Sequence, residues 1–243
     1  MDISPEKLVE SGAHFGHQMR RWDPRMEEYM YKVQDNTFIF DLIKTTSLLS
    51  EALEFLKEQS RSGKSILFVD TKKQSKDKLV EVAKETGSYF VTERWLGGTF
   101  TNFDQIKRSL RKMEDMRTKL NNGEYASYTK KERLLISRDI EKLERMVGGL
   151  SGMERIPDCL VIVDTHKEAT AVAEGNALKV PVVGIVDSNG NPDVVDFPIP
   201  MNDDATAAVS YVLDLMKDAI LEGKKGVKTE KPKKTVKKSE ETK

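Results

Sequence analysis

Short segments that are apolar throughout alternate with longer amphipathic segments along most of this chain, and no other feature constrains its fold as much. Strands that are apolar at every position are buried on both faces, which is typical of a parallel sheet covered by helices. The strands predicted in this way are Phe38–Leu42, Ser65–Asp70, Tyr89–Thr92, Cys159–Asp164 and Val182–Asp187. The predicted class is therefore α/β, a doubly wound parallel sheet with helices on both faces.

Helices are predicted between and after these strands. In residues 45–60, apolar side chains recur at three- and four-residue steps, and Gly63 follows where the helix ends. Further helices are predicted over residues 74–86, 166–179 and 204–222.

The first 37 residues lack this alternation. Ser4 and Pro5 are residue types that favour a helix start, so a short helix is predicted there. The segment Gly12–Met26 contains two glycines and a proline and shows neither a helical nor a strand period, which predicts a loop. We expect residues 10–37 to pack as a loop on the α/β body.

Residues 103–147 also interrupt the alternation. Seam positions recur at alternating steps of four and three residues in two runs. Turn-forming residues around Gly123 lie between the two runs. The runs are Ile106, Leu110, Met113, Arg117 and Leu120, and then Ile136, Ile140, Leu143 and Val147. This spacing predicts an antiparallel coiled-coil helical hairpin that protrudes from a body made of residues 1–102 and 148–222.

The formal net charge is zero, with 40 basic and 40 acidic residues, but the charges are unevenly distributed. Residues 104–146 hold 12 Lys and Arg against 8 Asp and Glu, and residues 222–243 hold 9 Lys against 4 Glu. Because salt screens charges beyond about 8 Å, local positive patches can bind phosphate on a neutral molecule. Residues 223–243 are too polar to form a core and are predicted to be disordered, either as a solubilising tail or as a phosphate-binding one.

No stretch approaches the roughly 18 apolar residues that a membrane-spanning helix needs, and Met1–Pro5 does not start a secretory signal. We therefore expect a cytoplasmic protein that contacts no membrane. The single cysteine, Cys159, lies in an apolar run, which predicts a buried thiol and excludes a disulfide within the chain.

The phosphate-binding motifs of α/β enzymes are absent from the sequence. It contains neither G-x-G-x-x-G nor G-x-x-x-x-G-K-[ST], and its one Gly-Lys-Ser run precedes a strand. Asp70, Asp164 and Asp187 each end a predicted strand, and we interpret them as caps of the following turn or helix. The alternative is that they bind a metal in a phosphate- or nucleotide-binding enzyme. No plausible nucleophile accompanies a histidine, so no catalytic residue and no cofactor is predicted.

His14 and His17 form an H-x-x-H pair in the predicted N-terminal loop. With Asp187 or Asp203 they would complete a set of zinc or magnesium ligands if folding brought them together. Two histidines alone do not specify a metal site, so the sequence leaves this question open.

Three segments combine cations with aromatic, hydroxyl or glycine residues, as RNA-binding surfaces do. Arg20–Arg25 places three arginines around a tryptophan, and Arg94–Asn102 joins an Arg-Trp pair to two glycines and several side-chain donors. In the second segment, burial of Trp95 in the core is the favoured interpretation. Lys72 and Lys73 lie at a predicted strand-to-helix corner that suits a phosphate.

Together with the hairpin, these segments predict a protein that binds folded RNA through its phosphates and its shape. The predicted RNA-binding residues are Arg20, Arg21, Trp22, Arg25, Lys72, Lys73, Arg94, Lys107, Arg108, Arg111, Lys130 and Lys131. An adaptor that binds only proteins through the hairpin is a further alternative, and no self-association is expected.

Several strings of the chain closely resemble the bacterial small-subunit ribosomal protein S-two family. They are Gly12–Gln18, Arg21–Met26, Phe68–Gln74, Arg94–Asn102, Leu143–Arg145 with Gly148-Gly149, Pro157-Asp158, Val186–Asn189 with Asp193, and Ile199–Ala205. The resemblance runs in order over residues 3–222, and H-F-G-H-Q and R-W-L-G-G-T-x-T-N are its most specific strings.

The resemblance implies a flavodoxin-like body with a protruding helical hairpin and a structural, non-catalytic role in translation. It also implies a place on the small ribosomal subunit near the head–body junction, where the protein contacts rRNA and neighbouring ribosomal proteins. Help in docking the small-subunit protein S-one, which brings mRNA, is implied as well. The residues predicted above to bind RNA become the rRNA contacts in this comparison.

Overall fold

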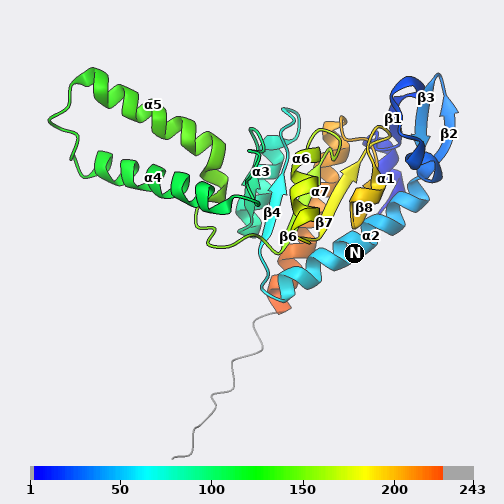
Figure 1. Cartoon of the computed structure of the whole chain (residues 1–243). Coiled ribbons are helices and arrows are strands. Elements are labelled where there is room, and N and C mark those ends of the chain that lie inside the picture. The colour runs from blue at the N-terminus through cyan, green and yellow to red at the C-terminus, as the bar shows by residue number, and fades with distance from the viewer. Residues whose placement is uncertain (1–2, 227–243) are drawn as a thin grey trace, which may run out of the picture.

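The computed structural model describes residues 3–226 and shows an α/β body from which two helices project (Figure 1). The strands are β1 (Phe15–Gln18), β2 (Met30–Gln34), β3 (Thr37–Phe40), β4 (Ile66–Val69), β5 (Tyr89–Val91), β6 (Cys159–Val163), β7 (Val182–Val186) and β8 (Phe197–Pro200). The α-helices are α1 (Pro5–Glu10), α2 (Leu42–Arg61), α3 (Lys76–Thr86), α4 (Phe103–Asn121), α5 (Lys130–Val147), α6 (Ala169–Ala177) and α7 (Thr206–Gly226). Short 3-10 helices are η1 (Met19–Arg21), η2 (Pro24–Tyr29), η3 (Gly148–Leu150) and η4 (Pro192–Val194).

Five strands form the sheet of the body, in the order β5-β4-β6-β7-β8, and every neighbouring pair is parallel. This is the flavodoxin-like strand order, and it confirms the predicted doubly wound α/β class. The strands β4, β6 and β7 are buried at every residue, as their apolar runs predicted.

Alternate residues of the same strands supply two separate cores. On β4, Ile66 and Phe68 join one core with α2, α3 and α7, whereas Leu67 and Val69 join the other with α6 and the base of α4. Because successive side chains of a strand point to opposite faces, one apolar run serves both layers of helices. Cys159 is buried in the first of these cores, as predicted, and burial raises the pKa of its thiol to about 12.

The N-terminal residues form a second, antiparallel sheet in the order β1-β3-β2, which corrects two predictions. The segment Gly12–Met26 is not a loop throughout, because it contains β1 and η1. The predicted strand Phe38–Leu42 exists as β3, but it pairs with β1 and β2 instead of joining the parallel sheet. Asp35 and Asn36 both have positive φ angles, 49° and 61°, and form the tight turn that joins β2 to β3.

The strand β8 is missing from the sequence prediction. Its sequence is Phe197-Pro198-Ile199-Pro200, and prolines lack the N–H group that a central strand needs. In the structure β8 pairs only with β7, at the edge of the sheet, which is where proline is tolerated within a sheet.

The helices α4 and α5 run in opposite directions and project together from one side of the body (Figure 1). A capping box starts α5: Thr129 and Glu132 each accept a hydrogen bond from the other's backbone N–H. The predicted seam is buried at Ile106, Leu110, Met113, Ile140 and Val147, partly buried at Leu120, Ile136 and Leu143, and exposed at Arg117. The helical pair is therefore present, while its coiled-coil packing and its status as a separate unit remain predictions.

The base of the hairpin packs directly on the edge strand β5 through Gly149. A Cβ atom at Gly149 would lie 2.1 Å from the carbonyl oxygen of Phe90 and 2.6 Å from its ring. The carbonyl and the ring of Phe90 belong to a strand of the sheet, so moving them would cost packing energy. Only glycine therefore allows η3 to approach β5 this closely.

We therefore expect Gly149→Ala to lower the free energy of unfolding by about 1–3 kcal/mol through overpacking at the hairpin base. Gly97→Ala is the matched control, because a Cβ there would meet no atom within 4 Å. Urea denaturation of the two variants tests this, and equal stabilities would show that the contact between Gly149 and Phe90 does not constrain the hairpin.

The C-terminal helix extends beyond its predicted end. α7 continues to Gly226, so residues 223–226 of the predicted disordered tail are helical, and residues 227–243 lie outside the described residues. Within residues 3–226, none of the helices combines the length and the apolar character that crossing a bilayer requires.

Candidate nucleic-acid interface

The predicted RNA-binding residues do not form one continuous site. The residues Arg20–Arg25 lie with the N-terminal sheet, at the end of the molecule opposite the hairpin cations (Figure 1). Lys72, Lys73 and Arg94 follow the carboxyl ends of β4 and β5. The exposed members are Arg20, Arg21, Arg25, Lys73, Arg94, Arg108, Arg111, Lys130 and Lys131.

In the N-terminal cluster, Arg20–Arg25, contacts with neighbouring side chains hold the tryptophan and one of the arginines in fixed positions. Trp22 is half-buried and stacks on Phe38, with ring centroids 4.6 Å apart. Arg25 donates two hydrogen bonds, of 2.9 and 2.7 Å, to the carboxylate of Asp23, which lowers the pKa of that carboxyl. Half of the Arg25 side chain (51%) is still exposed, so its guanidinium is oriented and remains accessible.

Lys72 is turned into the protein, which corrects its predicted role as a phosphate contact. Its ammonium lies 2.6 Å from Asp203, 2.7 Å from Asp204 and 3.0 Å from Asp164, and only 11% of its side chain is exposed. An ammonium surrounded by three carboxylates is not available to a phosphate. Its neighbour Lys73 is exposed.

The aspartates at the strand ends cap the turns that follow, as predicted. Asp70, Asp164 and Asp187 each accept a hydrogen bond from a backbone N–H within the next three residues, at 2.8, 2.8 and 2.5 Å. Doubly wound enzymes bind their ligands at this edge of the sheet. Here the ammonium of Lys72 lies among the carboxylates instead.

Burial and charge repulsion shape the titration of this cluster. Burial, together with the neighbouring Asp187 and Asp164, raises the pKa of Asp203. Burial opposes the charge on Lys72, but Asp203 and the other carboxylates outweigh it and raise the pKa of the ammonium. The cluster therefore keeps its internal cation and disfavours a full set of ionised carboxylates.

His17 joins the N-terminal sheet to this cluster. Its Nδ1 lies 3.0 Å from Asp187, its Nε2 lies 3.8 Å from Asp204, and its backbone N–H donates to Ser188 at 2.7 Å. Across residues 3–226, no group of three or more His, Cys, Asp and Glu side chains is arranged to hold a metal ion. The arrangement therefore does not support the zinc or magnesium site that the sequence left open.

The contact with Asp187 raises the pKa of His17, although burial opposes it. A raised folded-state pKa stabilises the protein fully below the unfolded value, and this contribution disappears as the pH rises through the folded-state value. We expect wild-type protein to exceed His17→Asn in unfolding free energy by more at about pH 6 than at about pH 9. Urea denaturation at both pH values measures the difference, and a pH-independent difference contradicts a charged His17.

Trp95 is buried, with 5% of its surface exposed, and its ring meets Phe100 edge to face at 5.0 Å between centroids. The favoured interpretation of Trp95 as a core residue is therefore confirmed. Its indole N–H donates to Glu174 on α6 at 3.1 Å. Arg94, the preceding residue, is exposed, so the Arg-Trp pair separates into one surface and one core side chain.

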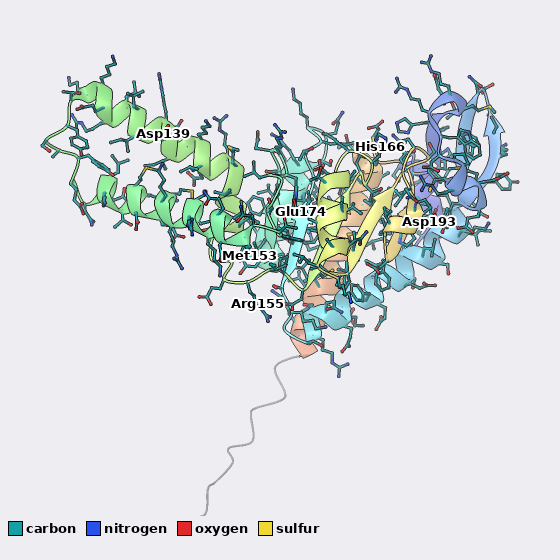
Figure 2. All side chains as sticks on the ribbon, in the orientation of Figure 1. Asp139, Met153, Arg155, His166, Glu174 and Asp193 are labelled. Carbon is teal, nitrogen blue, oxygen red and sulfur yellow. The ribbon has the colours of Figure 1, made fainter. Side chains whose placement is uncertain are left out.

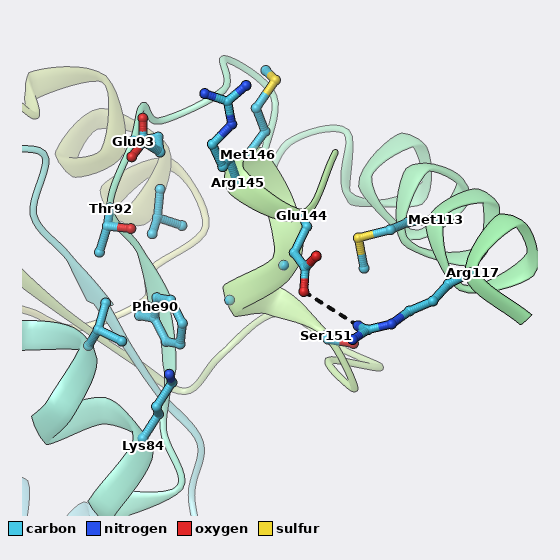
Figure 3. Close-up of a pocket in the computed structure, with 14 residues that line it drawn as sticks. Lys84, Phe90, Thr92, Glu93, Met113, Arg117, Glu144, Arg145, Met146 and Ser151 are labelled. Carbon is cyan, nitrogen blue, oxygen red and sulfur yellow. Dashed lines mark hydrogen bonds and ion pairs between the residues drawn. The ribbon is translucent and has the colours of Figure 1, made fainter. Parts of the chain in front are cut away.

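A pocket of about 500 Å³ lies between the body and the base of the hairpin (Figure 3). Its lining includes Lys84 of α3, Arg117 of α4 and Arg145 of α5. Arg117 also forms an ion pair with Glu144 (3.4 Å) that joins the two helices. Lys84 lies outside every motif of the sequence, because no local pattern relates α3 to the hairpin.

Comparisons with known proteins show the family to which the chain belongs. Residues 8–223 match the family model of ribosomal protein S2. The chain belongs to the ribosomal protein S2 family. It is similar to the small ribosomal subunit protein uS2 of Petrotoga mobilis (strain DSM 10674 / SJ95), with 45% identity over 224 residues, which cover 92% of this chain and 78% of that protein.

Membership of this family confirms the predicted resemblance and the predicted non-catalytic role. The chain is a structural constituent of the small ribosomal subunit, and as a ribosomal protein it belongs to the cytoplasm, as predicted. The alternative of a phosphate- or nucleotide-binding enzyme is thereby excluded.

Proposed function

We propose that this chain binds small-subunit rRNA near the head–body junction through two separate groups of cations. One group is Arg20, Arg21 and Arg25 beside Trp22, and the other lies on the hairpin. The supporting observation is where the cations lie. The body buries Lys72 among carboxylates, whereas the hairpin presents exposed lysines and arginines on helices that project away from it (Figure 1).

Two binding regions at opposite ends of one molecule suit a protein that bridges separate parts of a folded RNA. Arg25 is already held by Asp23, so less conformational entropy is lost when it meets a phosphate. We also propose that the chain helps to dock the small-subunit protein S-one. This second role is supported by the family alone.

Sedimentation of cell lysate through a gradient tests the proposal. We expect the chain to travel with small subunits at low salt and to be released by a high-salt wash, because phosphate contacts release counterions. The triple variant Arg20→Gln, Arg21→Gln, Arg25→Gln should shift toward the free fraction at a salt concentration that wild-type protein withstands. Wild-type protein found only in the free fraction would overturn the proposal. Small subunits depleted of the chain that retain as much protein S-one as subunits containing it would overturn the docking role.

A further inference from the structure

The carboxylate of Glu174 is buried in the body and holds the chain segment that leads into the hairpin. One of its oxygens accepts hydrogen bonds from the Trp95 indole (3.1 Å) and the Gly98 backbone N–H (2.7 Å). The other accepts from the backbone N–H groups of Phe100 (2.8 Å) and Thr101 (3.2 Å). Figure 2 shows Glu174 in the body, toward the side from which the hairpin projects.

These donors belong to a loop outside the strands and α-helices, in which Thr99 and Asn102 donate backbone hydrogen bonds to Leu96 and Gly98 within the loop itself. Residues 92–102 lie between β5 and α4 and pair with no strand, so several of their backbone N–H groups depend on a side-chain acceptor. Only Asn102 separates Thr101 from the first residue of α4, Phe103. Whatever fixes the loop therefore also fixes the point and the direction at which the hairpin leaves the body.

The charge of Glu174 is stabilised by these donors and not by a cation. Across residues 3–226, no Lys, Arg or His forms an ion pair with Glu174, whose exposed fraction is 8%. Burial alone would raise its pKa, yet the four N–H groups lower it. A neutral or apolar residue in its place would leave several buried donors without partners, so packing alone does not explain a glutamate here.

We propose that Glu174 is the positioning residue of the RNA-binding surface: it sets the direction of the hairpin and holds Arg94 at the surface. This inference rests on the proposed function for its RNA readout, whereas the hairpin direction is measured without RNA. The second attachment of the hairpin, Gly149 against Phe90, lies on α5's side of the base. With one attachment at each helix, the angle between the hairpin and the body is fixed, whereas a single attachment would leave this angle free.

Pulsed EPR distances in the full chain test the proposal directly. Spin labels are attached at Lys112→Cys on α4 and Lys64→Cys before β4, both exposed positions, while the native Cys159 is buried and stays unlabelled. We expect one narrow distance in the otherwise wild-type protein and a broad or shifted distribution in Glu174→Ala. Glu174→Gln should be intermediate, because its amide has a single acceptor oxygen.

A control of similar instability separates positioning from general destabilisation. Leu213→Ala removes a fully buried side chain of α7 in the other core and should lower the melting temperature while keeping the narrow distance. In a Trp22→Phe background, Trp95 emission should move to longer wavelength in Glu174→Ala and stay unchanged in Leu213→Ala. A folded Glu174→Ala protein with the wild-type distance would overturn the proposal.

The expected effect of Glu174→Ala on RNA affinity is opposite in sign to the effect of its change in charge. Glu174→Ala removes a negative charge, which by itself favours RNA binding, yet we expect an affinity loss of about tenfold because the hairpin is no longer held. If the wild-type chain fails to bind rRNA while Glu174→Ala still broadens the distance, the proposed function fails and the positioning role stands.

Should Glu174→Ala not fold, hydrogen exchange in wild-type protein decides the question. The amides of Gly98, Phe100 and Thr101 should then exchange as slowly as those in the buried part of α6, because each donates to Glu174. Rapid exchange at these three amides would overturn the proposal without any variant.

Discussion

Lys72→Met lowers the free energy of unfolding by about 3–5 kcal/mol near neutral pH, because it leaves buried carboxylates without their cation. Asp203 and Asp164 are 1% and 10% exposed, so water cannot replace the ammonium that lies between them. Methionine fills a similar volume, which confines the change to the charge. Denaturation in urea measures the loss, and it should grow as the pH rises, because burial and the neighbouring carboxylates raise the pKa of Asp203 in the folded state.

Two companion variants identify the cause. Lys73→Met changes the exposed neighbour and should stay within about 0.5 kcal/mol of wild type. The double variant Lys72→Met, Asp203→Asn should recover part of the loss, since it removes one of the stranded charges. A Lys72→Met protein as stable as Lys73→Met would show that the cluster does not depend on its cation.

Neutralising five hairpin cations should reduce the affinity for small-subunit rRNA by up to about 10³-fold at physiological salt. The residues changed to glutamine are Lys107, Arg108, Arg111, Lys130 and Lys131. Each phosphate contact contributes about 0.9 to the slope of log affinity against log salt on duplex, so five contacts predict a slope that is smaller by about 4–5. Fluorescence titration of a labelled rRNA fragment at several salt concentrations measures both quantities.

The control carries the same number of neutralised charges on the body: Arg61, Lys64, Arg155, Lys179 and Lys225, all exposed. It should leave the salt slope close to that of the wild type, and an equal effect in both variants would mean that only net charge matters. Lys130 and Lys131 provide a second check, because they occupy the first turn of α5, where the helix dipole disfavours cations. Their neutralisation should maintain or raise the melting temperature while it weakens RNA binding.

The sequence alone was sufficient wherever the deciding property is local. Continuous apolar runs predicted β4, β6 and β7, and heptad steps predicted the two helices of the hairpin, because burial on both faces or along one stripe leaves a period in the chain itself. Several specific strings, above all His14–Gln18 and Arg94–Asn102, predicted the family. Trp95 was also correctly assigned to the core, because an indole is a large apolar group that gains free energy when it is buried.

Only the tertiary structure decided which distant groups meet. β1 and β8 have no period of their own, and each exists because a neighbouring strand supplies its hydrogen bonds. Lys72 looked like a surface cation until folding placed it against aspartates more than 90 residues away. The direction of the hairpin depends on Glu174, whose carboxylate no local pattern connects to the loop that it holds. Periodicity reports whether a residue is buried, but the partner of a buried polar group is set by chain segments far along the sequence, and so it becomes visible only once they are packed together.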